Sequence, residues 1–307
     1  MIGIIHYAYG APNTLDNVGV MFEHMLKGRP ISPQMLAGIE KQYRALGTVD
    51  PLSSISKRQA KALEQVLQPF FNEEVMVYNA YKHTTPFVEE VVLQMINDGV
   101  SMIVTLPVTP LFSKTGTGAF QEEVRHQLKK YNYNAVVIDV DDWHVHPQLV
   151  SILANRVQSA YEWLPASIRP FTKVLFTAHS QPINPEVNNF YIKQFHELAM
   201  AIAEQLHLLN WSAVYRSVSN KETWLGPDVK DVIREEVARG TKGIVTCDLL
   251  AMIEDIEVYF EIGQECQELC KELGLEFVRT EFPNDSFDFV VALATIVKEK
   301  VALAQLM

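Results

Sequence analysis

The sequence contains only three cysteines in 307 residues, Cys247, Cys266 and Cys270. So few thiols exclude a disulfide framework, and they cannot supply the four thiolates of an iron–sulfur cluster within one chain. No apolar run approaches the roughly 20 residues that a membrane-spanning helix needs. The first residues also lack the basic segment of a secretory signal. We therefore expect a cytoplasmic protein without a transmembrane helix or an iron–sulfur cluster.

Positive charge is also scarce. The chain has 26 Lys and Arg against 37 Asp and Glu, a formal net charge of −11. Nucleic-acid binding depends on clustered basic residues, so we expect no nucleic-acid partner. The segment Gly116-Thr117-Gly118 lacks the third glycine of a dinucleotide-binding loop, and the sequence has no Gly-Lys-Ser/Thr phosphate loop. A nucleotide-dependent enzyme is therefore disfavoured.

Short apolar runs rich in β-branched residues alternate with longer segments of helical periodicity. This alternation predicts parallel sheets covered by helices on both faces, an α/β fold. The expected strands are residues 2–7, 74–78, 101–106, 135–140, 173–177, 213–217, 243–247 and 275–278. The expected helices include residues 86–97, 120–131, 147–164, 187–207, 229–239 and 253–273.

The strands fall into two sets of four, separated by a proline-containing segment at residues 164–170. We expect an N-terminal lobe of residues 1–165 and a C-terminal lobe of residues 166–307, each with a four-stranded parallel sheet. A last helix at about residues 286–304 is long enough to cross back onto the first lobe. Because ligands of parallel sheets bind beyond the carboxyl ends of the strands, a cleft between the lobes is the expected site.

Two residues that follow predicted strands suit chemistry in such a cleft. Tyr9 precedes Gly10 and Pro12, a tight exit that turns its side chain either into the cleft or into local packing. His179 stands in Thr-Ala-His-Ser-Gln-Pro after the fifth strand. Histidine accepts protons near neutral pH and binds metals, so this position favours a catalytic base, with a structural role as the alternative.

An acidic segment follows the seventh strand. On an α-helix, its glutamates fall on one narrow face without a basic residue among them, and apolar side chains and two cysteines fall opposite. The glutamates are Glu254, Glu257, Glu261, Glu265 and Glu268. Such a face is either a solvated surface or a row of oxygen ligands for a cation.

The chain resembles the ferrochelatase family along its whole length, and most closely the soluble Gram-positive type that acts on coproporphyrin III. The matching segments come in the family's order: 9–12 (Tyr-Gly-Ala-Pro), 28–30 (Gly-Arg-Pro), 50–52 (Asp-Pro-Leu), 82–83 (Lys-His), 110–113 (Pro-Leu-Phe-Ser), 177–182 (Thr-Ala-His-Ser-Gln-Pro), 224–229 (Trp-Leu-Gly-Pro-Asp-Val) and 256–258 (Ile-Glu-Val). The histidine motif, the Trp-Leu-Gly-Pro motif and the glutamate helix together are specific to the family.

The resemblance implies two Rossmann-like lobes with a porphyrin between them and insertion of Fe²⁺ into that porphyrin in haem biosynthesis, by a lyase. It implies that His179 and Glu257 accept the pyrrole protons and bind the metal, and that Glu261 and Glu265 are further metal-binding carboxylates on the same helix. The implied porphyrin-binding residues are Tyr9, Arg29, Tyr43, Phe120 and Trp224. Iron and porphyrin are substrates, no prosthetic group is expected, and the protein is taken to be a monomer.

The sequence departs from this pattern at the positions where the resemblance implies contacts to the propionates of coproporphyrin. Leu26, Gln42 and Asp50 stand in place of two arginines and a serine. Leu and Gln cannot bind a carboxylate as an arginine does, and Asp repels one. Leu111 replaces a polar residue and Phe120 a tyrosine. We therefore expect relaxed or altered porphyrin choice, with protoporphyrin IX as the alternative to coproporphyrin III.

Two other functions remain open. A chelatase fold that binds porphyrin or haem without turnover, as a carrier, is compatible with the missing propionate contacts, but it needs neither His179 nor Glu257. A chelatase for another tetrapyrrole or metal is also compatible, because carboxylate and imidazole ligands do not discriminate among divalent first-row ions.

Overall fold

The computed structural model describes residues 1–46 and 51–306. Within them the chain forms eight strands in two separate four-stranded sheets, and all pairs of neighbouring strands are parallel. The strands are β1 (Ile2–Ala8), β2 (Val75–Tyr81), β3 (Met102–Pro107), β4 (Val136–Asp139), β5 (Thr172–His179), β6 (Trp211–Arg216), β7 (Gly243–Asp248) and β8 (Glu276–Arg279). The order is β2-β1-β3-β4 in one sheet and β6-β5-β7-β8 in the other.

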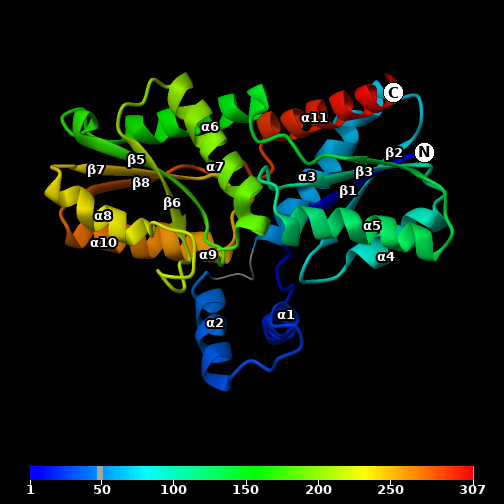
Figure 1. Cartoon of the computed structure of the whole chain (residues 1–307), viewed down its shortest axis with the longest axis horizontal. Coiled ribbons are helices and arrows are strands. Elements are labelled where there is room, and N and C mark those ends of the chain that lie inside the picture. The colour runs from blue at the N-terminus through cyan, green and yellow to red at the C-terminus, as the bar shows by residue number, and fades with distance from the viewer. Residues whose placement is uncertain (47–50, 307) are drawn as a thin grey trace.

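Helices cover both faces of each sheet (Figure 1). They are α1 (Asn17–Met25), α2 (Pro33–Ala45), α3 (Leu52–Leu67), α4 (Val88–Asn97), α5 (Ala119–Lys130), α6 (Pro147–Trp163), α7 (Pro185–Gln205), α8 (Val229–Ala238), α9 (Ile256–Val258), α10 (Cys266–Glu272) and α11 (Phe287–Leu306). Short 3₁₀ turns occur at η1 (Gln68–Phe70) and η3 (Arg169–Phe171), and π-helical turns at η2 (Lys114–Gly118) and η4 (Tyr259–Glu265). The predicted two-lobed α/β architecture is confirmed.

Local sequence explains where several elements begin. Ser32, Asn184 and Asp228 each accept a hydrogen bond from a backbone N–H in the first turn of the following helix, at α2, α7 and α8. Proline opens both α2 and α7, where its missing N–H is no loss. The central strand β1 is buried at all seven positions, which requires the continuous apolar run that the sequence has there.

The two lobes exchange helices. α6 precedes the expected boundary at residues 165/166, yet it packs against α7, β7 and β8 of the second lobe. The last helix, α11, packs against α3, β3 and β4 of the first lobe. One buried core cluster accordingly runs through both lobes, from Ile4 in β1 to Phe176 in β5. The boundary at 165/166 therefore separates the two sheets but not the helices that cover them.

The carboxyl ends of both central strands lie near the junction of the lobes. Figure 1 shows α1 and α2 projecting beneath this junction, beside α9. Val18 of α1, Tyr43 of α2 and Ile256 of α9 share one buried apolar cluster, so this projection contacts the second lobe. No helix among the described residues is long and apolar enough to span a membrane.

Candidate active site

His179 is the last residue of β5, and a hydrogen bond at Nδ1 favours one tautomer of its ring. Its Nδ1 lies 2.5 Å from the carbonyl oxygen of Ser180. A carbonyl only accepts hydrogen bonds, so Nδ1 carries the proton of the neutral ring and Nε2 keeps its lone pair. The Tyr191 hydroxyl donates to the His179 carbonyl at 2.7 Å. The side chain is 33% exposed, so Nε2 is available to a proton or a metal ion.

The segment after His179 is hydrogen-bonded to the loop that contains Trp224. The Ser180 hydroxyl donates to the carbonyl of Leu225 at 2.6 Å, and the Leu225 N–H donates to the carbonyl of Gln181 at 2.9 Å. Trp224 forms an isolated β-bridge with Pro182 and is partly buried. The histidine motif and the Trp-Leu-Gly-Pro motif, 45 residues apart at Ser180 and Leu225, are therefore one structural unit.

Glu257 comes from the first turn of α9 and faces His179. The Asp255 carboxylate caps this turn by accepting from the Val258 N–H at 2.9 Å. Glu257 Oε2 then lies 3.6 Å from His179 Nε2, and its side chain is 41% exposed. Two proton acceptors of different chemistry, an imidazole nitrogen and a carboxylate, thus stand together at an accessible surface. This pair suits transient binding of a divalent cation and acceptance of protons.

A buried guanidinium, which the sequence reasoning missed, completes this group. Arg216 ends β6, is 2% exposed, and donates from Nε to Asp248 Oδ2 at 2.9 Å and from an Nη to Glu257 Oε2 at 3.3 Å. Thr177 also donates to Asp248 at 2.9 Å. Burial alone lowers the pKa of Arg216, but Asp248, Asp255 and Glu257 outweigh it and raise that pKa. The signal available in the sequence was a charged residue directly ending each of two apolar strands.

The acidic segment is not the regular α-helix that its spacing predicts. Helix begins only at Ile256, and residues 259–265 form the π-helical turn η4, in which the wider turn displaces side chains from a single α-helical face. Glu254 precedes the helix and pairs with Arg279 at 2.5 Å. The expectation of one continuous acidic face from Glu254 to Glu268 is therefore wrong.

The predicted metal-binding carboxylates also have partners from other elements. Glu261 accepts from the backbone N–H and the hydroxyl of Ser217 at 2.5 and 2.6 Å. Glu265 pairs with Lys230 of α8 at 2.8 Å. Across residues 1–46 and 51–306, no three His, Cys, Asp or Glu side chains form a group that could hold a metal ion. The structure thus places His179 next to Glu257 and engages Glu261 and Glu265 elsewhere.

Tyr9 lies on the opposite side of the junction, after β1. Gly10 allows this exit: its φ is +91°, and a Cβ there would lie 2.7 Å from Thr84 Oγ1. The Tyr9 side chain is half-exposed and contacts His83 edge-on, with ring centroids 4.7 Å apart. Burial, followed by the negative charges of Glu257 and Asp255, raises the pKa of the Tyr9 hydroxyl. The Tyr9 hydroxyl, on the first lobe, is thus within range of the negative charge around Glu257.

His83 is the residue whose ring contacts Tyr9. Its Nδ1 lies 3.1 Å from Nδ1 of His24 in α1. Burial, then the charges of Lys82 and His24, lowers the pKa of His83 to about 4. At neutral pH the His83 imidazole is therefore uncharged. Phe87 stacks on His24 at a centroid distance of 5.0 Å.

The other predicted porphyrin-binding residues differ in how much of the side chain is exposed. Phe120 is 2% exposed and stacks on Tyr7, with ring centroids 4.0 Å apart, so its ring face is already covered. Tyr43 is 1% exposed, within the cluster that joins α1, α2 and α9. Arg29 is exposed just after α1.

The positions expected to recognise propionates lie around α1 and α2. Leu26 follows the last turn of α1 and is partly buried, whereas Gln42 is exposed on α2. Asp50 lies outside the described residues. Leu111 is 1% exposed, in the core cluster shared by the lobes, so it presents no group to the junction.

Comparison with known proteins decides the family. The Ferrochelatase family model matches residues 1–301. The chain belongs to the ferrochelatase family. It is 31% identical to a ferrochelatase of Herpetosiphon aurantiacus over 96% of this chain and 97% of that one. It is 29% identical to the coproporphyrin III ferrochelatase of Bacillus subtilis over 98% of both chains, and 31% identical to that of Halalkalibacterium halodurans over 98% of this chain and 97% of that one.

Two solved structures share the fold of this chain. SirB from Bacillus subtilis with Fe³⁺ has a TM-score of 0.62 at 11% identity, over 99% of this chain and 97% of that one. The sirohydrochlorin chelatase SirB from Bacillus subtilis subspecies spizizenii, in complex with cobalt, has a TM-score of 0.56 at 12% identity, over 98% and 95%. As a member of the ferrochelatase family, the chain is a porphyrin metal chelatase, a lyase of haem biosynthesis, whose substrates are a porphyrin and a metal ion.

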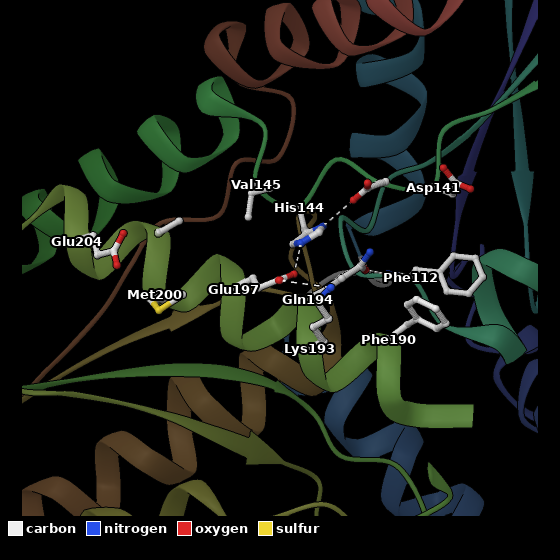
Figure 2. Close-up of a pocket in the computed structure, with 12 residues that line it drawn as sticks. Phe112, Asp141, His144, Val145, Phe190, Lys193, Gln194, Glu197, Met200 and Glu204 are labelled. Atoms are coloured by element: carbon white, nitrogen blue, oxygen red, sulfur yellow. Dashed lines mark hydrogen bonds and ion pairs between the residues drawn. The ribbon is translucent and has the colours of Figure 1, made fainter. Parts of the chain in front are cut away.

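A pocket of about 710 Å³ lies elsewhere on this ferrochelatase, along the outer face of α7 (Figure 2). His144 sits in its wall, with Nδ1 3.2 Å from Asp142 and Nε2 3.0 Å from Glu197. Glu197 and Tyr191, the residue that anchors His179, are six residues apart on α7, so their side chains point in directions about 120° apart around the helix axis. None of the predicted site residues lines this pocket, so it is separate from the group around His179 and Glu257.

Proposed function

We propose that this chain inserts Fe²⁺ into a porphyrin, with His179 and Glu257 as proton acceptors and transient metal ligands. The observation that carries the proposal is the 3.6 Å separation of His179 Nε2 and Glu257 Oε2. The hydrogen bond from Nδ1 to the Ser180 carbonyl leaves the Nε2 lone pair free in the neutral ring. Both side chains are partly exposed, so a macrocycle and a hydrated cation can reach them.

The reaction explains why this pair of residues suits the task. A free-base porphyrin has two N–H protons that leave as the metal enters, so acceptors are needed beside the ring. The same groups must hold the metal only briefly. A single imidazole and a single carboxylate, with water completing the coordination, release a divalent ion more readily than the closed thiolate cage of a structural zinc site.

Tyr9 and Trp224 define where the ring would lie. Tyr9 follows β1 in the first lobe, and its half-exposed side chain lies beside His83. Trp224 is joined to the histidine motif through Pro182. We therefore place the macrocycle between Tyr9 and the pair. Arg29, exposed after α1, is suited to a propionate at the rim.

Glu261 and Glu265 act on the cation in another way in this proposal. Their oxygens already accept from Ser217 and pair with Lys230, so they attract a cation toward the pair without holding it. Metal delivery along this helix would then depend on ionic strength, because interactions between exposed charges are screened by salt.

For the porphyrin, we propose relaxed or altered choice between coproporphyrin III and protoporphyrin IX. Leu26 and Gln42 cannot form bidentate contacts with a carboxylate. Protoporphyrin IX has two propionates, coproporphyrin III has four, and fewer propionates demand fewer arginines. The chain is also proposed to act as a cytoplasmic monomer without nucleic-acid partners and without a prosthetic group. Its three cysteines are buried.

The test measures metal insertion into both porphyrins by absorbance and fluorescence, for the wild type, His179→Ala and Glu257→Gln. We expect kcat to fall at least 100-fold in each variant, the scale of a lost general base, with porphyrin binding retained. The ratio of kcat/KM for the two porphyrins reports substrate choice, and a strong preference for coproporphyrin III would contradict the relaxed-choice proposal. A wild type that binds either ring but inserts neither iron nor zinc would instead be a carrier.

A further inference from the structure

Arg216 brings a permanent positive charge to the place where a divalent cation is to bind. Its side chain is 3% exposed, yet an Nη lies 3.3 Å from Glu257 Oε2, the same oxygen that faces His179. A guanidinium stays protonated at all accessible pH values. Every cation that approaches Glu257 is therefore opposed at close range by a charge that cannot be neutralised.

The contacts around Arg216 hold it in this place. Its Nε donates to Asp248 Oδ2 at 2.9 Å. The other oxygen of Asp248 accepts from the backbone N–H groups of Leu250 and Ala251 at 3.0 and 2.7 Å. With Thr177 also donating to Asp248, both oxygens of the carboxylate accept two hydrogen bonds each, which fixes the acceptor that holds Arg216.

The residues around Arg216 carry a net negative charge that a metal ion can balance. Arg216 interacts with Asp248, Asp255 and Glu257. One guanidinium against three carboxylates leaves a formal net charge of −2 beside His179, which one divalent ion would balance. Without Arg216 the same residues would carry −3 and hold a cation more tightly.

We propose that Arg216 is a positioning residue that keeps Glu257 aimed at His179 and limits how tightly the pair holds a divalent cation, so that the ion passes on to the porphyrin. The inference rests on the proposed function of His179 and Glu257. It concerns the balance between metal capture and metal release at that site, a property that those two residues do not set by themselves.

The first test uses substitutions that change the charge in opposite directions. Arg216→Gln should bind Zn²⁺ or Co²⁺ in the absence of porphyrin roughly tenfold more tightly, the scale of one unit charge at close range in an accessible site. Asp248→Asn keeps one of the two acceptor oxygens and removes one negative charge beside Arg216, so it should bind the same ions several-fold more weakly. General damage to the fold would weaken binding in both variants.

Turnover separates this role from a structural one. Arg216→Gln should lower KM for the metal and kcat together, because tighter ground-state binding slows release. Arg216→Lys restores the charge and should return metal affinity to within about threefold of the wild type. Lys173→Gln is the matched control: it removes a buried ion pair with Glu236, 3.4 Å long, at the opposite end of β5, and it should change neither metal affinity nor KM.

The outcomes distinguish this inference from the proposed function. If the wild type shows no turnover, the proposed function fails, and the porphyrin-free metal affinities still report on Arg216. If the wild type turns over and Arg216→Gln binds Zn²⁺ no more tightly than the wild type, the inference is wrong. Should Arg216→Gln fail to fold, the inference then requires weaker binding in Asp248→Asn, and unchanged affinity there overturns it.

Discussion

At the scale of single residues, His6 links the stability of the protein to pH. It is fully buried in β1, with Nε2 2.5 Å from Gln59 Oε1. The Gln59 amide nitrogen donates to the Asn284 carbonyl, so its oxygen accepts from His6. Burial lowers the pKa of His6 to about 4, despite hydrogen bonds to Gln59 and Asn79 that raise it.

The direction of the pH effect follows from this lowered pKa. An unfolded histidine has a pKa of about 6.5, so between roughly pH 6.5 and 4 the unfolded state binds one more proton than the folded state. His6 therefore stabilises the fold above pH 6.5, and this contribution is lost as pH falls toward 4. From pH 7 to pH 5 the loss amounts to about 2 kcal/mol.

Urea unfolding of the wild type and His6→Asn at pH 7 and pH 5 measures this loss. We expect the free energy of unfolding to fall by about 2 kcal/mol less in the variant than in the wild type over that interval. His126→Asn, an exposed position on α5, is the control and should keep the wild-type pH dependence. An identical pH dependence in His6→Asn would show that His6 is not the titrating group.

The sequence predicted some site residues and missed others for identifiable reasons. His179 was predicted from its strand-end position and its motif, and Glu257 from the acidic segment and the resemblance to the family; the structure brings their side chains to 3.6 Å. Arg216 and Asp248 were missed because they end β6 and β7, which lie on either side of β5 and are not neighbours. Only the strand order shows that the two charges meet. The burial of Phe120 against Tyr7 likewise depends on tertiary packing that no local pattern contains.

At the scale of elements, the eight strands were predictable and the acidic segment was not. Parallel strands buried on both faces read as continuous apolar runs, which are visible in the sequence. A π-helical turn has no such recognisable pattern in the sequence. The α-helical period therefore misplaced the glutamates relative to one another.

Substitutions in the Glu265–Lys230 pair test what the acidic segment around η4 contributes to metal delivery. Both side chains are substantially exposed, 51% and 30%, so the pair interacts weakly and salt screens it. We expect Glu265→Gln to raise KM for the metal no more than about threefold, with kcat unchanged and with the effect disappearing at high salt. Lys230→Gln should lower KM slightly, since it frees the Glu265 carboxylate. A fall in kcat for Glu265→Gln as large as that for Glu257→Gln would make Glu265 a metal ligand.

At the scale of the whole molecule, the exchange of α6 and α11 joins the two lobes into one unit. Arg58 of α3 donates to both oxygens of Asp285 at 2.5 and 3.2 Å, and this contact lowers the pKa of the Asp285 carboxyl. Arg156 of α6 pairs with Asp288 at the start of α11, which lowers the pKa of Asp288 to about 2. The helices that cover one sheet are thus anchored through the other lobe.

This connection predicts that the lobes unfold together. The core cluster that contains Ile4 of β1 also contains Phe176 of β5, so exposing one sheet removes packing from the other. Trp143 lies buried near Phe289 of α11, and Trp211 contacts Phe176 at the second sheet. A variant that keeps only Trp143 and a variant that keeps only Trp211, each with the other three tryptophans changed to Phe, place single fluorescence reporters in different parts of the molecule. Their urea midpoints should agree with each other and with far-ultraviolet circular dichroism.

Calorimetry tests the same prediction. We expect a single unfolding transition in which the calorimetric and van't Hoff enthalpies agree. Separate midpoints for the two reporters would mean that the exchanged helices do not couple the sheets. Coupling also matters for the site, because Tyr9 comes from one lobe and His179 and Glu257 from the other. A lobe that unfolded alone would separate these residues, so cooperative unfolding implies that metal insertion is lost at the same denaturant concentration as the fold and not before it.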